Sequence, residues 1–191
     1  MRRRDGRRGQ AMVEMALLLP VLMLLFLGSW TAANLIDDNN AAAQATRAGA
    51  RLGAELGNGS ALGLTQNQID VDILDQVYPI VSPQLTNAKV TEIDIYQPSG
   101  CTGTTPFATG TCPPNNGAYT AGELIDTYTV TGGVVSNTCG TCTFTLANRS
   151  QTHPNEAELG VRLVFKYTSP ALTFFTQTDS QYTVMRLAPT S

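Results

Sequence analysis

One carboxylate stands alone in an otherwise uncharged stretch near the N-terminus. Glu14 is the only charged residue between positions 10 and 36, and Gly9 and five arginines precede it. A charge at the centre of a bilayer costs roughly 2.5–3.5 kcal/mol on insertion scales, and less near the edge. A carboxylate in the first turn of a helix is also favoured by the helix dipole. The plainest interpretation of Glu14 is therefore an acid at a membrane interface.

Four cysteines form the second group with possible chemistry: Cys101, Cys112, Cys139 and Cys142. An even number of cysteines outside the cytoplasm favours two disulfides, and three connectivities are open. Local pairing, Cys101–Cys112 and Cys139–Cys142, closes the shortest loops, and the first bridge would close a long loop over residues 97–122. The second pair also fits a periplasmic redox motif or half of a zinc site. No helix-forming sequence follows it and ten residues separate the other pair, which favours structural disulfides.

Residues for hydrolytic or metal-dependent catalysis form no recognisable set. His153 is the only histidine, so no pair of histidines can bind a metal, and we expect it in a surface loop. No serine lies in a glycine-flanked elbow, and no G-x-x-x-x-G-K-[ST] phosphate loop is present. Asp70, Asp72 and Asp75 lack the glycine and closing glutamate of a calcium loop, so we expect them on a solvated helix face. We predict neither an enzyme nor a bound cofactor.

A long apolar segment must position Glu14. Residues 11–33 form a run of 23 residues whose only charge is Glu14, and about 20 apolar residues suffice for a helix to cross a bilayer. Five arginines precede the run and only two lie in the twenty residues after it, which predicts a cytoplasmic N-terminus. We assign 1–9 to a basic leader and 10–36 to a transmembrane helix. A cleaved secretory signal fits less well, because its apolar core would be shorter.

The charge of the chain is divided unevenly. The 191 residues carry a formal net charge of −3, although five arginines and only one aspartate lie in the first nine. From residue 10 onward, seven basic and 14 acidic residues leave a net charge of −7. Nucleic-acid binding needs clustered Lys and Arg along one face. The acidic body therefore predicts no nucleic-acid partner.

The apolar segment should continue as a helix outside the membrane. Residues 37–57 are rich in alanine, the strongest helix former, and Gly57 begins a glycine-rich stop. Pro20 interrupts the apolar part, and membrane helices tolerate such a kink where neighbours satisfy the freed backbone groups. One helix over about 11–56 is predicted. A stripe of small residues on its outer half comprises Ala41, Ala45 and Ala48.

The remainder, residues 58–191, should form an α+β domain outside the cytoplasm. Thr65 and Gln68 stand at the spacing of a capping box, before a helical pattern that Pro79 and Pro83 should end. Alternating apolar and polar residues then predict an antiparallel sheet of four to six strands, on which the outer half of the long helix packs. The expected strands are 91–96, 127–131, 142–146, 158–167 and 181–187.

The opening stretch resembles a class III prepilin signal, in which a basic leader ends in glycine and a glutamate follows five residues later. More specifically, "RRGQAMVEMALLLPVLMLLFLGSW" followed by "AAAQATRAGARLGA" is similar to the N-terminus of TadE-like proteins. These are pseudopilins of the tight-adherence (Tad/Flp) pilus system. The matching features are Gly9, Glu14, Leu17 to Pro20, and Arg47 to Arg51. The resemblance covers residues 7–54.

This resemblance implies a pilin-like α+β fold and roles for several residues. A prepilin peptidase would cleave directly after Gly9, on the cytoplasmic side, and leave an ammonium on Gln10. Glu14 would pair with that ammonium of a neighbouring subunit or be read by the peptidase, and Pro20 belongs to the same assembly segment. The implied partners are the peptidase, other pilin and pseudopilin subunits packed through the N-terminal helix, and the cytoplasmic membrane.

Two functions follow as hypotheses. The first is a pseudopilin or minor pilin component that assists pilus assembly from the membrane, with the disulfide-bonded body outside. The alternative is a permanently membrane-anchored extracytoplasmic binding domain without a role in pilus assembly. The two differ in whether the first nine residues are missing from the mature protein.

Overall fold

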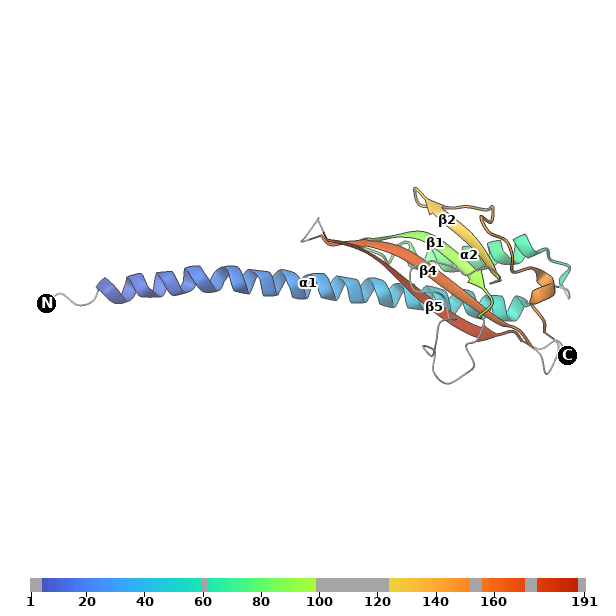
Figure 1. Ribbon diagram of the computed structural model, residues 1–191, viewed down its shortest axis with the longest axis horizontal. Helices are drawn as coiled ribbons and strands as arrows, with labels where there is room; N and C mark the ends of the chain where they lie inside the picture. Colours follow the sequence, from blue (N-terminus) through green and yellow to red (C-terminus); the bar gives the residue numbers. More distant parts are fainter. Residues whose placement is uncertain (1–4, 60–61, 99–123, 152–155, 171–174, 189–191) are drawn as a thin grey trace.

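A single helix that is far longer than the folded body dominates the molecule (Figure 1). The computed structural model describes residues 5–59, 62–98, 124–151, 156–170 and 175–188. Helix α1 spans Asp5–Leu56, with Pro20 inside it. It thus begins within the basic leader, several residues before the predicted start near residue 11. Its end agrees with the sequence: Gly57 has a positive φ of 57° and its N–H donates to the carbonyl of Gly53 at 2.9 Å, an αL termination that glycine favours.

The second helix, α2 (Gln66–Val81), begins at the predicted capping box. The N–H of Gln68 donates to the Thr65 hydroxyl, and the Gln68 side chain accepts from the N–H of Thr65. The prediction that Pro79 ends this helix is wrong, because Pro79 lies inside it and the cap is Ser82, whose N–H donates to the carbonyl of Tyr78 at 2.9 Å. A proline removes only its own N–H, so the bonds from the following residues complete the last turn.

Five antiparallel strands form one sheet in the order β3-β2-β1-β4-β5. This agrees with the predicted α+β class and strand number. β5 begins five residues before its predicted start, and the two-residue β3 was not predicted. The strands are β1 (Ala88–Tyr96), β2 (Ile125–Thr131), β3 (Val134–Val135), β4 (Glu158–Thr168) and β5 (Thr176–Arg186).

The strand predicted over 142–146 is wrong. Only one bridge, Asp126 to Cys142, joins this segment to β2, and a short 3-10 helix, η2 (Leu146–Asn148), follows. The side-chain hydroxyl of Thr143 accepts from the N–H of Ile125 at 2.8 Å, and the N–H of Phe144 donates to the Asp126 carboxylate at 3.0 Å. Side chains therefore take backbone groups that a regular ladder would pair.

Helices α1 and α2 pack together, and α1 also packs on β4 and β5. The core combines small residues of α1 with aliphatic residues of α2 and of one face of the sheet. Ala41 and Ala45 are buried as the small-residue stripe suggested, whereas Ala48 is only half-buried. Two glycines of α1 permit the close contact: an added Cβ would collide with Val77 at Gly49 and lie 2.8 Å from Leu159 at Gly53.

Candidate functional site

The N-terminal half of α1 extends away from the body (Figure 1), and its apolar side chains are exposed. We call residues 12–30 the apolar half of α1. The segment is long and apolar enough to cross a membrane, and none of its most apolar part is buried against the rest of the protein. The large residues with more than half of their surface exposed are Met12, Val13, Met15, Leu17, Leu18, Leu19, Val21, Leu22, Met23, Leu24, Leu25, Phe26 and Trp30.

The four predicted processing and assembly positions all lie on α1. Gly9 and Gln10 are in its helical backbone, and Glu14 and Pro20 are exposed. Gln10 and Glu14 are four residues apart, which places them one turn apart on neighbouring parts of the helix surface. The helix therefore presents these positions along one rod of about three turns. Cleavage at Gly9 and pairing by Glu14 stay predictions.

Polar contacts join α1 to the sheet just beyond the apolar half. The hydroxyls of Thr31 and Ser169 lie 3.1 Å apart, and the Tyr167 hydroxyl donates to the carbonyl of Thr31 at 3.3 Å. About two turns after Thr31, the buried carboxylate of Asp38 accepts from the N–H of Thr86 at 3.1 Å. Burial raises the pKa of Asp38, and this backbone hydrogen bond opposes the rise. These contacts fix the position of the body along the helix.

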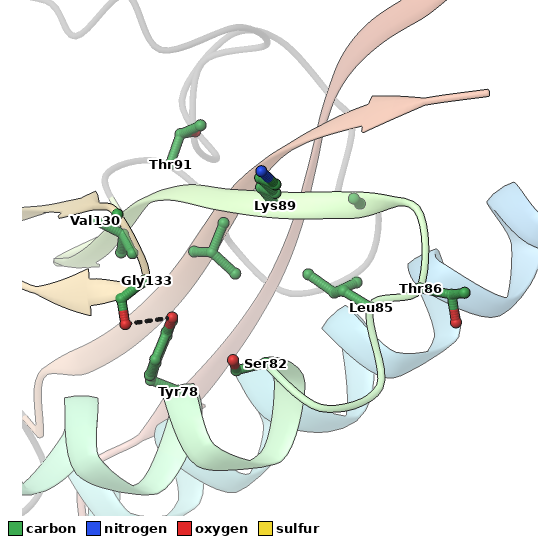
Figure 2. Close-up of a pocket in the computed structure, with 11 residues that line it drawn as sticks. Tyr78, Ser82, Leu85, Thr86, Lys89, Thr91, Val130 and Gly133 are labelled. Atoms are coloured by element: carbon green, nitrogen blue, oxygen red, sulfur yellow. Dashed lines mark hydrogen bonds between the residues drawn. The ribbon is translucent and has the colours of Figure 1, made fainter. Parts of the chain in front are cut away.

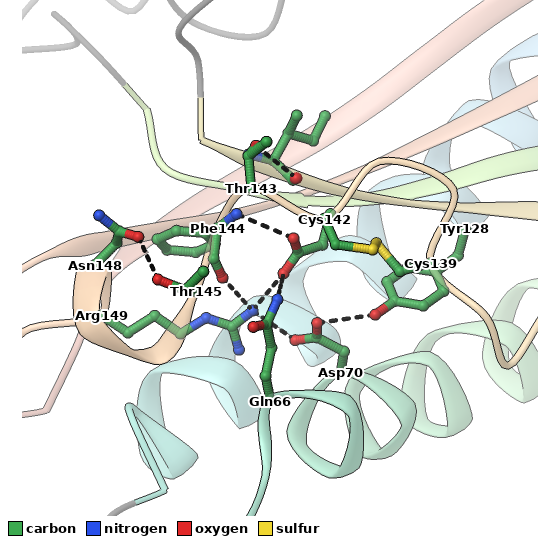
Figure 3. A network of polar contacts seen from close by, with 12 residues as sticks. Gln66, Asp70, Tyr128, Cys139, Cys142, Thr143, Phe144, Thr145, Asn148 and Arg149 are labelled. Atoms are coloured by element: carbon green, nitrogen blue, oxygen red, sulfur yellow. Dashed lines mark hydrogen bonds and ion pairs between the residues drawn. A yellow bond between two sulfur atoms is a disulfide. The ribbon is translucent and has the colours of Figure 1, made fainter.

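A buried cluster of charged groups lies between α2, β2 and the segment around η2 (Figure 3). Arg149 Nη2 lies 2.7 Å from Asp70 Oδ1 and 2.9 Å from Asp126 Oδ2. The contact with Asp70 Oδ1 is an ion pair by distance, while that oxygen accepts no well-oriented hydrogen bond. The Tyr128 hydroxyl donates to Asp70 Oδ2 at 2.9 Å, and Gln66 Nε2 donates to Asp126 Oδ2 at 2.8 Å. The cluster ties α2, β2 and the segment around η2 together.

Two carboxylates compete for one guanidinium in this cluster. Desolvation, followed by repulsion from Asp70, raises the pKa of Asp126 to about 7. Desolvation and the nearby Asp70 also raise the pKa of the Tyr128 hydroxyl, which therefore stays a donor. The Arg149 guanidinium lies 4.7 Å over the Phe144 ring, a cation–π contact that adds to its stabilisation. A buried network with these contacts specifies packing, and we assign it a structural role.

The prediction that Asp70 lies on a solvated face is wrong. Asp70 is fully buried, whereas Asp72 and Asp75 are exposed as expected. The spacing of these residues on α2 could not reveal this difference, because its cause is Arg149, which lies 79 residues further along the chain. A second buried arginine, Arg162 on β4, pairs across the sheet with Asp94 at 2.8 Å. No role was predicted from the sequence for Arg149 or for Arg162.

Cys139 and Cys142 form a disulfide, with Cα atoms 5.8 Å apart. This confirms the predicted local pairing for these two residues. Cys101 and Cys112, the loop over 97–122 beyond Pro98, and His153 lie outside the described residues, so their predictions are untested. Among the residues that the structure describes, no three His, Cys, Asp or Glu side chains gather as a metal site.

A hollow of about 590 Å³ lies between the end of α2, the first half of β1 and the turn between β2 and β3 (Figure 2). The Tyr78 hydroxyl closes one side by donating to the carbonyl of Gly133 at 2.8 Å. Lys89 is the only charged residue in its lining, and it is exposed. A single solvated lysine beside hydroxyls and apolar side chains lacks the paired acid and base of a catalytic site.

Comparison with known proteins bears on the exposed helix. Residues 9–51 match the family model described as TadE-like protein. The N-terminal part of the chain is therefore similar to TadE-like proteins. The match begins at Gly9 and ends in the part of α1 that packs on the body, so it takes in the apolar half of the helix and its contacts with the sheet. No curated protein and no solved structure matches the chain.

The TadE-like segment thus contains Gly9, Gln10, Glu14 and Pro20, while the body from residue 52 onward lies outside the match. Part of this segment is buried against α2 and the sheet, with Ala42, Ala45 and Ala50 fully enclosed. The apolar half contributes nothing to that core. An apolar surface of this extent on a helix needs a lipid or protein environment.

Proposed function

We propose that the chain is a TadE-like pseudopilin that assists assembly of a Tad-type pilus from the cytoplasmic membrane. The observation that carries this proposal is the family match to residues 9–51, on a helix whose apolar half is exposed and separate from the folded body. TadE-like proteins are associated with pili in a structural role. The N-terminus would be cytoplasmic and the body extracytoplasmic, as the five leading arginines favour.

Processing would convert the leader into an assembly signal. A prepilin peptidase would cut after Gly9 and leave an ammonium on Gln10, at the cytoplasmic end of α1. Between helices packed in a membrane, both that ammonium and the Glu14 carboxylate need partners, since an unpaired charge at low dielectric is costly. Glu14 of one subunit would accept the ammonium of the next, and the requirement for both would set the register between subunits.

The separation of the apolar half of α1 from the folded body supports distinct roles for the two parts. Assembly through the apolar half would leave the body unchanged, because no core residue comes from that half. Because Thr31 and Asp38 contact the body, a change in the position of the helix would move the extracytoplasmic domain with it. The segments 1–9, 10–36, 37–57 and 58–191 would then serve as leader, membrane helix, connecting helix and body.

Complementation tests this proposal. In a cell that carries the matching pilus system, deletion of the gene should abolish or strongly reduce surface pili, and the full chain should restore them. A Gly9→Leu variant should accumulate uncleaved in the membrane and fail to restore pili. Normal piliation of the deletion strain would contradict the proposal. It would favour the anchored binding domain, which has no role in assembly.

A further inference from the structure

The end of β4 next to Ser169 and the start of β5 next to Phe175 lie at the same level along α1 as the outer end of the apolar half. β4 and β5 run toward the middle of α1 and end beside it (Figure 1). The Ser169 hydroxyl lies 3.1 Å from that of Thr31, which fixes the level of this end. The N–H of Ser169 donates to the carbonyl of Phe175 at 3.0 Å, so Phe175 lies directly across the hairpin from Ser169. Phe175 is therefore close in level to Trp30.

The position of the outer membrane surface follows from the length of the apolar half. A hydrocarbon layer of about 30 Å takes about 20 helical residues. Counted from Ala11, this places Trp30 at the outer boundary, where aromatic side chains prefer to lie. Trp30 is 54% exposed, which leaves its ring available to the headgroup region. Ser169 and Phe175 would therefore lie at the outer interface as well.

Charges begin at the same level on both segments. On α1 no charged residue occurs from Met15 to Ile36, and the first is Asp37. In the hairpin no charged residue occurs from Tyr167 to Thr178, and Lys166 and Asp179 flank this stretch. The Tyr167 hydroxyl donates to the carbonyl of Thr31, 136 positions away in sequence, so the uncharged stretches of the two segments lie side by side.

The exposed groups at this end of the hairpin are suited to a lipid interface. Phe175 is 39% exposed, and Pro170 and Thr176 beside it are exposed too. Residues 171–174 lie outside the described residues. An exposed phenylalanine without a nearby charge has little to gain in water but gains from partial burial among lipid headgroups and the ends of the acyl chains.

We infer that the β4–β5 hairpin is a second membrane contact, with Phe175 in the outer interface beside Trp30. With a single membrane helix, the helix and the body attached to it can tilt together relative to the membrane, whereas a second contact on one side of the helix restricts this tilt. This inference rests on the proposed membrane insertion of α1. The occupant of the Phe175 surface is a lipid headgroup layer, continuous with the lipid that surrounds the apolar half.

Depth-dependent quenching tests the inference, because Trp30 is the only tryptophan in the chain. The full chain is reconstituted in phosphatidylcholine vesicles that carry bromine near the headgroup or near the bilayer centre. Reporter variants place one tryptophan in a Trp30→Phe background, as Phe175→Trp or, as a second reporter in the same turn, Thr176→Trp. A matched control, Leu62→Trp, replaces a side chain that is 65% exposed beyond the end of α1.

The predicted result is that the shallow bromine quenches Trp30 in the natural chain and the reporter at 175 or 176 to a similar extent, and leaves the reporter at 62 unquenched. Quenching of Trp30 without quenching at either hairpin position would overturn the second contact but leave membrane insertion intact. Absence of quenching at all positions would contradict membrane insertion itself, and the second contact with it.

Discussion

At the scale of single residues, Glu14 is the one carboxylate of the apolar segment, and its proposed assembly partner belongs to a neighbouring subunit. It is exposed on α1, one turn after Gln10, in a segment without any other charge. If its role is to pair with the ammonium of a neighbouring subunit, charge and geometry both matter. A shorter carboxylate keeps the charge but reaches less far, whereas an amide keeps the size and loses the charge.

This difference gives a prediction for assembly. Glu14→Gln should reduce piliation by about tenfold or more, because loss of one partner of a buried ion pair leaves the other charge uncompensated. Glu14→Asp should retain more activity than Glu14→Gln. The measurement is the amount of sheared surface pili, normalised to the membrane level of each variant. Equal piliation by the natural chain and the Glu14→Gln variant would contradict the proposed pairing role of Glu14.

Asp126 gives a second prediction at this scale, about pH. The pKa of Asp126 is raised to about 7 in the folded protein by desolvation and Asp70, whereas an aspartate in an unfolded chain titrates near 3.9. Between these values the folded state binds more protons than the unfolded state. The contribution of Asp126 to stability is thus fully present below about pH 4 and is lost as the pH rises through about 7.

The test compares melting temperatures from about pH 5 to pH 8. The natural chain should lose stability relative to Asp126→Asn as the pH rises, because the amide cannot ionise. Asp72→Asn, which changes an exposed aspartate on the same helix as Asp70, is the control and should follow the natural chain. Parallel curves for the natural chain and Asp126→Asn would show that Asp126 keeps the same charge across this range.

At the scale of elements, two glycines of α1 have opposite surroundings and so predict opposite effects. An added Cβ at Gly49 would collide with Val77, whereas nothing lies within 4 Å of one at Gly28. Gly49→Ala should destabilise the body by roughly 1–3 kcal/mol through overpacking. Gly28→Ala should be neutral or favour the helix by up to about 1 kcal/mol.

Urea unfolding of the chain in detergent, followed by circular dichroism, measures both effects. The two variants make the same chemical change in the same helix, so helix propensity cannot explain a difference between them. A stability equal to that of the natural chain for Gly49→Ala would mean that α1 and α2 are not in the close contact described.

The helices and strands differ in how well local sequence signals predict them. α1, the start of α2 and strand β4 could be predicted, since local signals define them: a long apolar run, a capping box at Thr65, and an alternation from Leu159 to Tyr167 that only Val164 disturbs. The non-strand at 142–146 could not, because side chains of Thr143 and Asp126 take the backbone bonds there. Likewise, the burial of Asp70 depends on Arg149, and no local pattern marks that distant pairing.

The residues of the candidate site also differ in whether the sequence alone could indicate them. Gly9, Glu14 and Pro20 could be proposed from the sequence because they belong to a linear signal on one helix, and their roles stay predictions. The Phe175 surface was not found, since the hairpin residues carry meaning only when Ser169 is seen beside Thr31. Thr31 and Ser169 are 138 positions apart, and a contact over such a separation produces no periodic pattern of residue types in a single sequence.

At the scale of the whole molecule, one continuous helix joins an apolar segment that is long enough to span a membrane to the folded body. The sheet and α2 enclose the outer half of α1, and the apolar half remains for lipid or for neighbouring helices. In the proposed account, processing at one end of this rod decides whether the molecule stays an anchored protein or becomes competent for assembly. All other roles assigned to the N-terminal segment depend on that step.

The most direct test is the mass and N-terminal residue of the mature protein, isolated from membranes of a cell that contains the matching peptidase. The account predicts a chain that begins at Gln10, and a Gly9→Leu variant that keeps its leader under the same conditions. A mature chain that still begins at Met1 or Arg2 would contradict the account. Glu14 would then be an acid at the membrane interface of a permanently anchored domain.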